Sequence, residues 1–488
     1  ARVVSPGGWF ILSCPLLGLG GLHSGNTFHL YEWRETELLA SVEALFEIVD
    51  RKSIKGPAGD VQIIAARRTE DSAITIETMS CEPDGRYESA IQHAADWIES
   101  HWVGSEARYG QGAETTLLAT SFAVLASETL GTLSNWNRQR VTDVASGILE
   151  YQDEETGLFG SWLVRDADLL AKPICDRKYV INQITYFCLS ALSALGFKPR
   201  HRLTFALSLL NNDELRKHIS DGPWHDIWNQ SNRLMFVLRN LIHLMDEPEL
   251  TATAHSTFDN VLAEIEERQD AETGLWFGAG VRNHRLGVYA ADHFVPFYLW
   301  RGRPLLRVDE MIDSVLGIQS PEGLFADSIG GGACEDLDAI DLLVKLSYLS
   351  DHRSEDVRLS LRRAYDRILQ LQCENGGFPN YLRHVSVPSW KRRLARRLGL
   401  SRLVELWRPT PPDLSNYSGW TVVSVRRGEP DMWGTWFRAL ALNLIVEKIP
   451  ELGIPQRDAR FHRLPALGWH DQDALRRSFA ESKSSNKA

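Results

Sequence analysis

The residues best suited to proton transfer lie in one short acidic segment. Glu335, Asp336, Asp338 and Asp341 fall within seven residues, directly after the glycines at 330–332. Carboxyl groups that share a dry cavity cannot all ionise, so at least one of them keeps its proton and can act as a strong general acid. Acid catalysis is therefore one interpretation of this segment.

The same acids also have a structural interpretation. Residues 336–349 form a predicted helix that is apolar almost all round, as a buried helix must be. Capping and the helix dipole favour acidic residues at such a start by about 0.3–1 kcal/mol. Asp336 and Asp338 lie near that start, so the residues alone leave acid catalysis and helix capping both open.

Polar and aromatic side chains on other predicted helices add candidates for substrate binding. Asn229 and Asn232 are three residues apart near the start of an apolar helix, which places them on one face. Asp292 and His293 are expected to begin a second apolar helix. The candidate substrate-binding residues are Tyr186, His225, Trp228, Asn229, Asn232, His293, Asp341, Trp420, Trp433 and Trp436. The aromatic members would attract a carbocation to their faces or stack on a sugar ring, and the sequence does not choose between these ligands.

An internal repeat indicates which elements position these residues. A turn with a glutamine, a glycine and an aromatic residue recurs at 152–159, 269–276, 319–325 and 372–378. Its glutamines are separated by 117, 50 and 53 residues, which implies a period of about 50–58 residues with one degenerate copy near residue 210. Each repeat unit is predicted to be a helical hairpin.

The third copy illustrates the hairpin pattern. Residues 307–318 have apolar residues at helical spacing and end at the turn, so they form an outer helix. The apolar helix after the turn is an inner helix, and the same pairing recurs at 181–195, 292–300 and 431–445. Alternating outer and inner helices predict an all-α fold, an α/α toroid of about six helical hairpins.

The repeated turns, together with helices such as 115–131, resemble those of the prenyltransferase and squalene-cyclase repeat superfamily over residues 85–450. The resemblance implies the same toroid, with functional side chains at its mouth, in the first turn of each inner helix. It also implies that the glutamine and the aromatic residue of each repeat join neighbouring helices. This structural role falls to Gln152, Gln269, Gln319 and Gln372.

Class II terpene cyclases of this superfamily protonate an alkene or an epoxide with the middle aspartate of an Asp-x-Asp-Asp-Thr-Ala motif. By resemblance, Asp336 matches the first aspartate and Asp338 matches the proton donor. Ala339 and Ile340 stand where the family has aspartate and threonine. The resemblance implies a proton-initiated isoprenoid cyclase in which Asp338 is the catalytic acid, Asp336 and Glu335 tune it, and the substrate is a small hydrophobic molecule.

Two other functions remain open. An α/α-toroid enzyme that acts on glycans, such as a lyase, an epimerase or a hydrolase, would use His225, Tyr186, His293 and the carboxylates for acid–base chemistry. A non-catalytic binding protein on the same scaffold is the third hypothesis. The cavity would separate them, because a closed aromatic chamber favours the cyclase and an open groove lined with Arg, His and Asn favours the glycan.

The expectation for cofactors is none, apart from Mg²⁺ if the substrate carries a diphosphate. Zinc is the weaker alternative. Protein prenyltransferases of the superfamily bind zinc with an Asp, a Cys and a His, and Cys334, Asp336 and His384 offer these residue types with the first two in reverse order. The six cysteines contain no C-x-x-C pair and indicate a reducing, cytoplasmic compartment.

Charge limits the class of partner. With 53 basic and 64 acidic residues the net charge is −11, which argues against a general nucleic-acid-binding protein. Residues 390–408, inside an insertion at 386–412, reverse this balance with seven basic residues and one acid interleaved with leucines. A basic amphipathic helix of this kind either makes peripheral contact with an anionic membrane or packs as a solvated arm over the toroid.

The chain is predicted to have three parts. Residues 1–84 form an N-terminal appendage, and residues 85–470 form the toroid with its basic insertion. The polar tail at 471–488 has too few apolar residues to pack and is expected to be disordered.

The appendage is predicted to be a small α/β unit. A helical pattern covers 35–49, and alternating apolar residues at 60–66 and 72–77 indicate strands. The most apolar stretch, 9–22, is too short to span a bilayer and is expected to be a buried arm.

Overall fold

A computed structural model describes residues 9–15, 47–56, 59–67, 85–170, 176–278, 280, 282–328, 330–382, 414–452, 461–465 and 467–475. These residues are mostly helical, as the all-α prediction required. The chain divides into two compact units, Ala1–Cys81 and Glu82–Ala488.

The described residues of the N-terminal unit form a three-stranded antiparallel sheet. β1 (Trp9–Pro15) pairs with β3 (Gly59–Arg67), and β3 pairs on its other edge with β2 (Glu47–Gly56). The strand order is therefore β1-β3-β2, with the strand that comes last in the sequence at the centre.

Only part of the predicted appendage can be compared with this sheet. The predicted strand at 60–66 lies within β3. The predicted helix at 35–49 is wrong for its last three residues, because the backbone from Glu47 onward pairs with β3. The predicted strand at 72–77 lies outside the described residues.

In the described part of the larger unit, six helices are buried over most of their surface. They are α3 (Leu117–Thr129), α5 (Arg177–Leu195), α8 (Ile227–Met245), α10 (His284–Arg301), α12 (Ala333–Leu346) and α16 (Met432–Lys448). Every residue of α3 is buried. A helix that is apolar all round has no face suited to water, so other helices must surround it.

A second set of helices is buried on one face only. It comprises α2 (Gly85–Ser100), α4 (Arg138–Glu150), α9 (Thr251–Glu266), α11 (Val308–Ile318) and α13 (Ser354–Leu369). Each precedes a buried helix in the chain, so the two kinds alternate. Before α8 the one-sided helix is replaced by three short elements, α6 (Thr204–Leu207), η3 (Ser208–Leu210) and α7 (Asn212–Ile219). This is the degenerate repeat.

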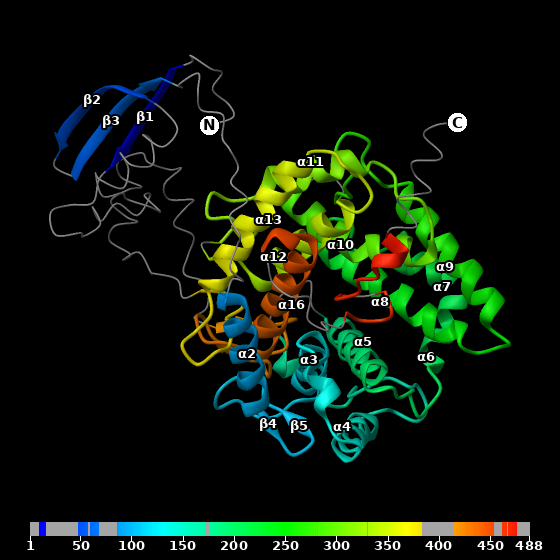
Figure 1. Cartoon of the computed structure of the whole chain (residues 1–488). Coiled ribbons are helices and arrows are strands. Elements are labelled where there is room, and N and C mark those ends of the chain that lie inside the picture. The colour runs from blue at the N-terminus through cyan, green and yellow to red at the C-terminus, as the bar shows by residue number, and fades with distance from the viewer. Residues whose placement is uncertain are drawn as a thin grey trace. The chain divides into compact units, whose positions relative to one another are not determined.

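The buried helices pack on one another in a closed sequence. α3 packs on α5, α5 on α8, α8 on α10, α10 on α12, α12 on α16, and α16 on α3 again. The one-sided helices pack on this set: α4 on α5, α9 on α8, α11 on α10 and α12, and both α2 and α13 on α16. The α12–α16 pair, with α13 and α2 beside it, can be followed in Figure 1.

The repeat glutamines connect consecutive units. In each turn the carboxamide nitrogen donates one hydrogen bond to the carbonyl of the turn's own glycine. It donates another to a carbonyl of the next unit: Gln152 to His201, Gln269 to Leu306, Gln319 to Ser360 and Gln372 to Ala90. The last of these bonds joins the fourth repeat turn to α2, 282 residues earlier in the chain. The glutamines therefore have a structural role.

The glycine of the repeat turn is required for two reasons, which Gly376 illustrates. Its φ of +95° lies in the left-handed region that side chains disfavour. A Cβ atom there would also lie 2.5 Å from the carbonyl oxygen of His93 on α2. The close approach of the turn to the next helix therefore excludes any side chain.

Helix α10 begins earlier than the apolar pattern indicated. The Asn283 side chain accepts the backbone N–H groups of the first turn, so the helix starts at His284. Asp292 and His293 consequently lie in the middle of α10, and the expectation that they begin an inner helix is wrong.

The segment 461–475 packs against the buried helices. His462 Nδ1 lies 3.2 Å from the Glu128 carboxylate on α3, and the Leu467 backbone N–H donates to the Tyr186 hydroxyl on α5. The predicted disordered tail starts inside this segment, where residues 472–475 form a helical turn with Leu475 buried. Burial of that leucine orders the first residues of the tail.

Among the described helices, none is both long and apolar enough to cross a membrane. The whole insertion at 386–412, with its basic segment at 390–408, lies outside the described residues, so the prediction of peripheral membrane contact stays a prediction.

Candidate acid site on helices α8, α10 and α12

Asp338 lies in the second turn of α12, because that helix begins at Ala333, and not in the first turn as expected. Its carboxyl group is fully buried, and neither oxygen has a hydrogen-bond partner. His293 on α10 places Nε2 3.9 Å from Asp338 Oδ2. The Trp228 indole on α8 is near enough to favour the charged carboxylate, although it forms no hydrogen bond. Asp338 therefore faces other buried helices.

Three buried carboxyl groups influence one another at this place. Asp338 and Asp341 are nearly one turn apart on α12, and Asp292 lies on α10 with both oxygens unpartnered. Burial raises the pKa of Asp338 and the pKa of Asp292 well above the usual range, and neighbouring negative charge raises both further. Like charges in a dry site cannot all ionise. Burial and neighbouring acidic groups therefore favour the protonated, neutral form of Asp338 and Asp292.

Asp341 differs from Asp338 and Asp292 because a cation pairs with it. The ammonium group of Lys345, one turn later on α12, pairs with its carboxylate, and both side chains are buried. Burial raises the pKa of Asp341, and Lys345 acts in the opposite direction. The predicted substrate-binding role of Asp341 is corrected on this ground: the ion pair occupies the carboxylate, which supplies negative charge beside the two neutral acids.

His293 is a neutral ring with a defined tautomer. The Ser231 hydroxyl donates its only proton to the Trp228 carbonyl oxygen at 2.8 Å, so it must accept the proton of His293 Nδ1, also at 2.8 Å. Burial lowers the pKa of His293 to about 3. The unprotonated Nε2 of His293, which can accept a proton, therefore faces the carboxyl group of Asp338.

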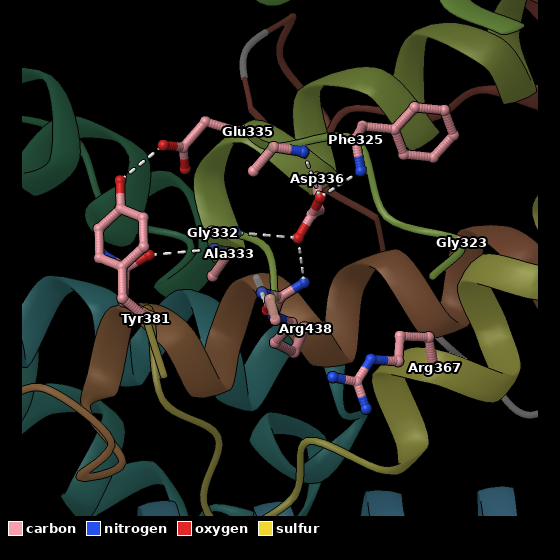
Figure 2. A network of polar contacts seen from close by, with 12 residues as sticks. Gly323, Phe325, Gly332, Ala333, Glu335, Asp336, Arg367, Tyr381 and Arg438 are labelled. Atoms are coloured by element: carbon pink, nitrogen blue, oxygen red, sulfur yellow. Dashed lines mark hydrogen bonds and ion pairs between the residues drawn. The ribbon is translucent and has the colours of Figure 1, made fainter. Parts of the chain in front are cut away.

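Glu335 lies three residues before Asp338 on α12 and has a hydrogen-bond partner of its own. The Tyr381 hydroxyl donates to Glu335 Oε1 at 2.6 Å, as Figure 2 shows. Burial raises the pKa of Glu335, and this hydrogen bond lowers it in part. Negative charge on Glu335 helps to raise the pKa of Asp338, which is the direction expected of a residue that tunes the acid.

Asp336 is fully paired and has a structural role. Its Oδ1 accepts the backbone N–H groups of Phe325 and Ala326 at 2.7 and 2.9 Å. Its Oδ2 accepts the N–H of Gly332 at 3.1 Å and the guanidinium of Arg438 at 2.6 Å (Figure 2). Four donors stabilise the carboxylate, so the prediction that Asp336 takes part in proton donation is corrected.

Two other repeats have a threonine where the third has Asp336. Thr185 on α5 and Thr435 on α16 each accept the backbone N–H of the aromatic residue in their own repeat turn, both at 3.0 Å. Asp336 makes the same bond in the third repeat. Its negative charge is matched by Arg438, which reaches it from α16.

Three predicted binding residues near the start of α8 do not meet the acid. His225 is exposed in the turn before the helix. The Asn229 Oδ1 accepts the Arg233 side chain at 2.8 Å, and the Asn232 amide donates to the Trp228 carbonyl at 2.9 Å. These bonds run within α8, whose helical spacing places the two asparagines on one face as predicted, and their part in substrate binding stays a prediction.

Trp433 and Trp436 belong to a packed aromatic cluster on α3, α5 and α16. The Trp433 ring lies 3.8 Å from Tyr417 and 4.9 Å from Phe122, measured between ring centroids. The Trp436 indole donates to the Thr129 hydroxyl at 3.1 Å. Both tryptophans are buried, so core packing replaces the predicted contact with substrate.

Tyr186 and Trp420 are also buried. The Tyr186 hydroxyl accepts the backbone N–H of Leu467. Burial raises the pKa of this phenol, and Asp292 lies near enough to raise it further. Trp420 lies between β6 (Leu414–Asn416) and β7 (Ser424–Arg426) and pairs with Leu169 through the backbone. Neither side chain is placed beside Asp338.

Trp228 is the predicted aromatic residue that does lie beside the acid. Its ring centroid is 5.4 Å from that of Tyr289 on α10, and it is only partly buried. Cys334 is one turn before Asp338 on α12; burial raises the pKa of its thiol, and the acidic groups around it raise that pKa further. The surroundings of Asp338 thus combine aromatic faces with neutral polar groups.

The predicted zinc ligands do not form a site within the described residues, where no cluster of three or more His, Cys, Asp and Glu suits a metal ion. Asp336 is occupied by its four donors. His384 lies outside the described residues.

Three residues of the site were not among the predicted ones. Asp292 and Lys345 are ionisable residues inside otherwise apolar helices, where burial of a charge is costly without a partner. An ionisable residue in an apolar helix was therefore the sequence signal that could have identified both Asp292 and Lys345. Ser231 offered no signal, because a hydroxyl in a helix usually bonds to its own backbone.

A cavity of about 660 Å³ lies elsewhere, between α5 and α8. Its lining includes Arg177, Arg233, His218, Asn182 and Asn240, and none of the acid-site residues. The lining expected for a glycan and the buried acid expected for a cyclase therefore occur at two separate places.

Comparisons with known proteins do not extend the sequence resemblance. No model of a known protein family matches the chain, and a search of curated proteins found no significant match. The functional argument therefore rests on the repeats and on the geometry around Asp338.

Proposed function

We propose that the unit Glu82–Ala488 is an α/α toroid of the kind implied by the resemblance. The closed packing of α3, α5, α8, α10, α12 and α16 supports this arrangement. So does the hydrogen bond from Gln372 to Ala90, which links the last repeat to the first. Six hairpins result when α6, η3 and α7 together are counted as one outer element.

We further propose that this toroid is a class II terpene cyclase-like enzyme with Asp338 as its proton donor. The observation that carries the proposal is a fully buried carboxyl group whose two oxygens have no partner and whose pKa is raised by burial and by Asp292. Such a group keeps its proton at neutral pH and has no internal acceptor within hydrogen-bond distance. It is suited to protonating a weakly basic substrate.

The proposed reaction is a proton transfer followed by ring closure. The Asp338 O–H bond breaks, and the proton bonds to an alkene carbon or to an epoxide oxygen, which leaves a cation on the substrate and a carboxylate on Asp338. The faces of Trp228 and Tyr289 would attract that cation. A second alkene attacks the cation to close the ring, and loss of a proton ends the reaction, so the product is an isomer of the substrate. Because Asp338 has no exposed surface, substrate entry requires a neighbouring side chain such as Trp228 to move.

The acid–base constellation of the glycan alternative is not assembled here. His225 is exposed, the Tyr186 hydroxyl is bound to the Leu467 backbone, and His293 alone lies at the acid. The isoprenoid proposal needs only the acid and the aromatic faces beside it.

Incubation of the full chain with farnesyl diphosphate, geranylgeranyl diphosphate, squalene and oxidosqualene tests the proposal, each with and without Mg²⁺. Acidic oligosaccharides form a parallel arm. We expect an isoprenoid product with the mass of its substrate and a different retention time. In D₂O that product should gain one deuterium, delivered by Asp338.

The Asp338→Asn variant should not form the product. Turnover of an oligosaccharide without any isoprenoid conversion would support the glycan enzyme instead. Conversion of neither class of substrate would leave a binding protein as the remaining hypothesis.

A further inference from the structure

The cavity between α5 and α8 exists because the outer layer is interrupted there. A continuous outer helix precedes each of the other described inner helices, whereas α6, η3 and α7 are short and are followed by Gly222 and Pro223. Pro223 ends the helical path, since it cannot donate a backbone hydrogen bond. The volume of about 660 Å³ is ordinary for a small-molecule site.

The charge on the cavity wall is positive on balance. Lys217 pairs with Glu214 at 2.5 Å and Arg233 pairs with Asp176 at 3.3 Å, while Asp221 adds one negative charge to the lining. Arg177 donates only to the backbone carbonyls of Ser161 and Val164, so its charge is not neutralised. Lys178 is exposed and forms no hydrogen bond or ion pair with any described residue. Both cations stand in the first turn of α5, where the helix dipole adds to the positive potential.

Buried amide side chains supply neutral polar contacts. Gln230 is fully buried, and its Nε2 donates to the His218 carbonyl at 2.7 Å, but its Oε1 has no partner. Asn240 is 7 % exposed and forms no hydrogen bond with the described residues. Gln230 and Asn240 are ten residues apart on α8, which separates them by about 15 Å along the cavity. A buried amide without a partner indicates a ligand that offers hydrogen-bonding groups.

Aromatic side chains lie between these amides. Tyr179 and Phe236 both line the cavity, with ring centroids 5.7 Å apart, and Phe205 faces the cavity from α6. Aromatic faces that alternate with amides suit a sugar ring, which has apolar C–H faces and hydroxyl groups around its edge. A lipid chain would instead leave the amides unpaired at a cost.

We propose that this cavity binds a sugar that carries a phosphate or a carboxylate group. The anion would lie near Arg177 and Lys178, the ring near Tyr179 and Phe236, and a hydroxyl group of the ring would donate to the unpartnered Oε1 of Gln230. This binding site goes beyond the proposed cyclisation, because no residue of the acid site lines the cavity.

Titration calorimetry on the full chain tests the site with defined probes. Glucose 6-phosphate and glucuronic acid represent the two sources of charge. Glucose removes the charge, inorganic phosphate removes the sugar, and farnesyl phosphate replaces the sugar with a lipid chain. We expect one or both acidic sugars to bind about tenfold more tightly than glucose or phosphate, since a charge-assisted contact and the ring contacts both add affinity.

Two variants and two controls locate the binding. Lys178→Gln and Gln230→Leu should each weaken binding about fivefold or more. Arg138→Gln should leave binding unchanged, because Arg138 is likewise an exposed cation at the start of a helix, α4, but lies outside the cavity. Asp338→Asn should also bind normally, which separates this test from that of the cyclase.

Four outcomes would overturn the proposal. The first is that neither acidic sugar binds at millimolar concentration, the second is that inorganic phosphate binds as tightly as the sugars, and the third is that farnesyl phosphate binds more tightly than both sugars. The fourth outcome is an equal loss of affinity in Arg138→Gln and Lys178→Gln, which would mean that anions are attracted only by the general surface charge.

Discussion

Replacing Asp338 with Asn tests whether the buried carboxyl group is a neutral acid or a charged carboxylate. Asn has nearly the same size and no acidic proton, so it copies the shape of the protonated side chain. In the wild type the folded-state pKa of Asp338 is raised well above the value of about 3.9 in an unfolded chain. Between these two pKa values the folded state holds a proton that the unfolded state has lost. The contribution of Asp338 to stability is therefore fully present below about pH 4 and declines as the pH rises.

The substitution removes this dependence on pH. Near about pH 4, Asp338→Asn and the wild type should have similar free energies of unfolding. Above that pH the variant should gain relative stability by about 1.4 kcal/mol per pH unit, until the pH reaches the folded-state pKa of Asp338. Urea unfolding over this range measures the difference. Turnover of a converted isoprenoid should fall by about 10²–10⁴ in the same variant.

Asp336→Asn is the matched control on the same helix. It removes the carboxylate that pairs with Arg438 and accepts three backbone N–H groups, so we expect a loss of about 3–5 kcal/mol in the free energy of unfolding. The acid mechanism would be refuted if Asp338→Asn became less stable than the wild type as the pH rose, because a carboxylate stabilised in the folded state behaves in that way. Unchanged turnover would equally exclude Asp338 as the proton donor.

Gly376→Ala should destabilise the protein more than Gly196→Ala, by about 1–3 kcal/mol in urea unfolding. Both glycines have positive φ, but only at Gly376 would the new Cβ meet a backbone atom, the His93 carbonyl oxygen at 2.5 Å; equal losses would contradict the close packing of the repeat turn. Burial lowers the pKa of His293 to about 3, so ¹⁵N NMR should find a neutral ring at about pH 5, where an ordinary histidine is charged. The proton should be on Nδ1 and should lose its hydrogen bond in Ser231→Ala; an imidazolium at that pH would count against the assigned tautomer.

The helices and the repeat turns could be predicted from the sequence because their signals are local. A helix that is apolar all round has to be buried, and α3, α5 and α16 are. A glycine at the same place in each repeat turn predicts a left-handed backbone conformation and a close approach of the turn to the next helix, and Gly376 has both. Local signals also misled, since the polar first turn of α10 hid its start and made Asp292 look like the beginning of a helix.

The role of each acid was decided by tertiary structure. Asp336 and Asp338 are both acidic and both near the start of α12, and nothing in their local sequence separates them. Two residues along a helix turn a side chain by about 200°, so the two carboxyl groups point in nearly opposite directions. One meets Arg438, 102 residues later in the chain, and is a paired carboxylate. The other meets His293 and Asp292 on α10, and burial favours its neutral form, because those groups come together only when the buried helices pack.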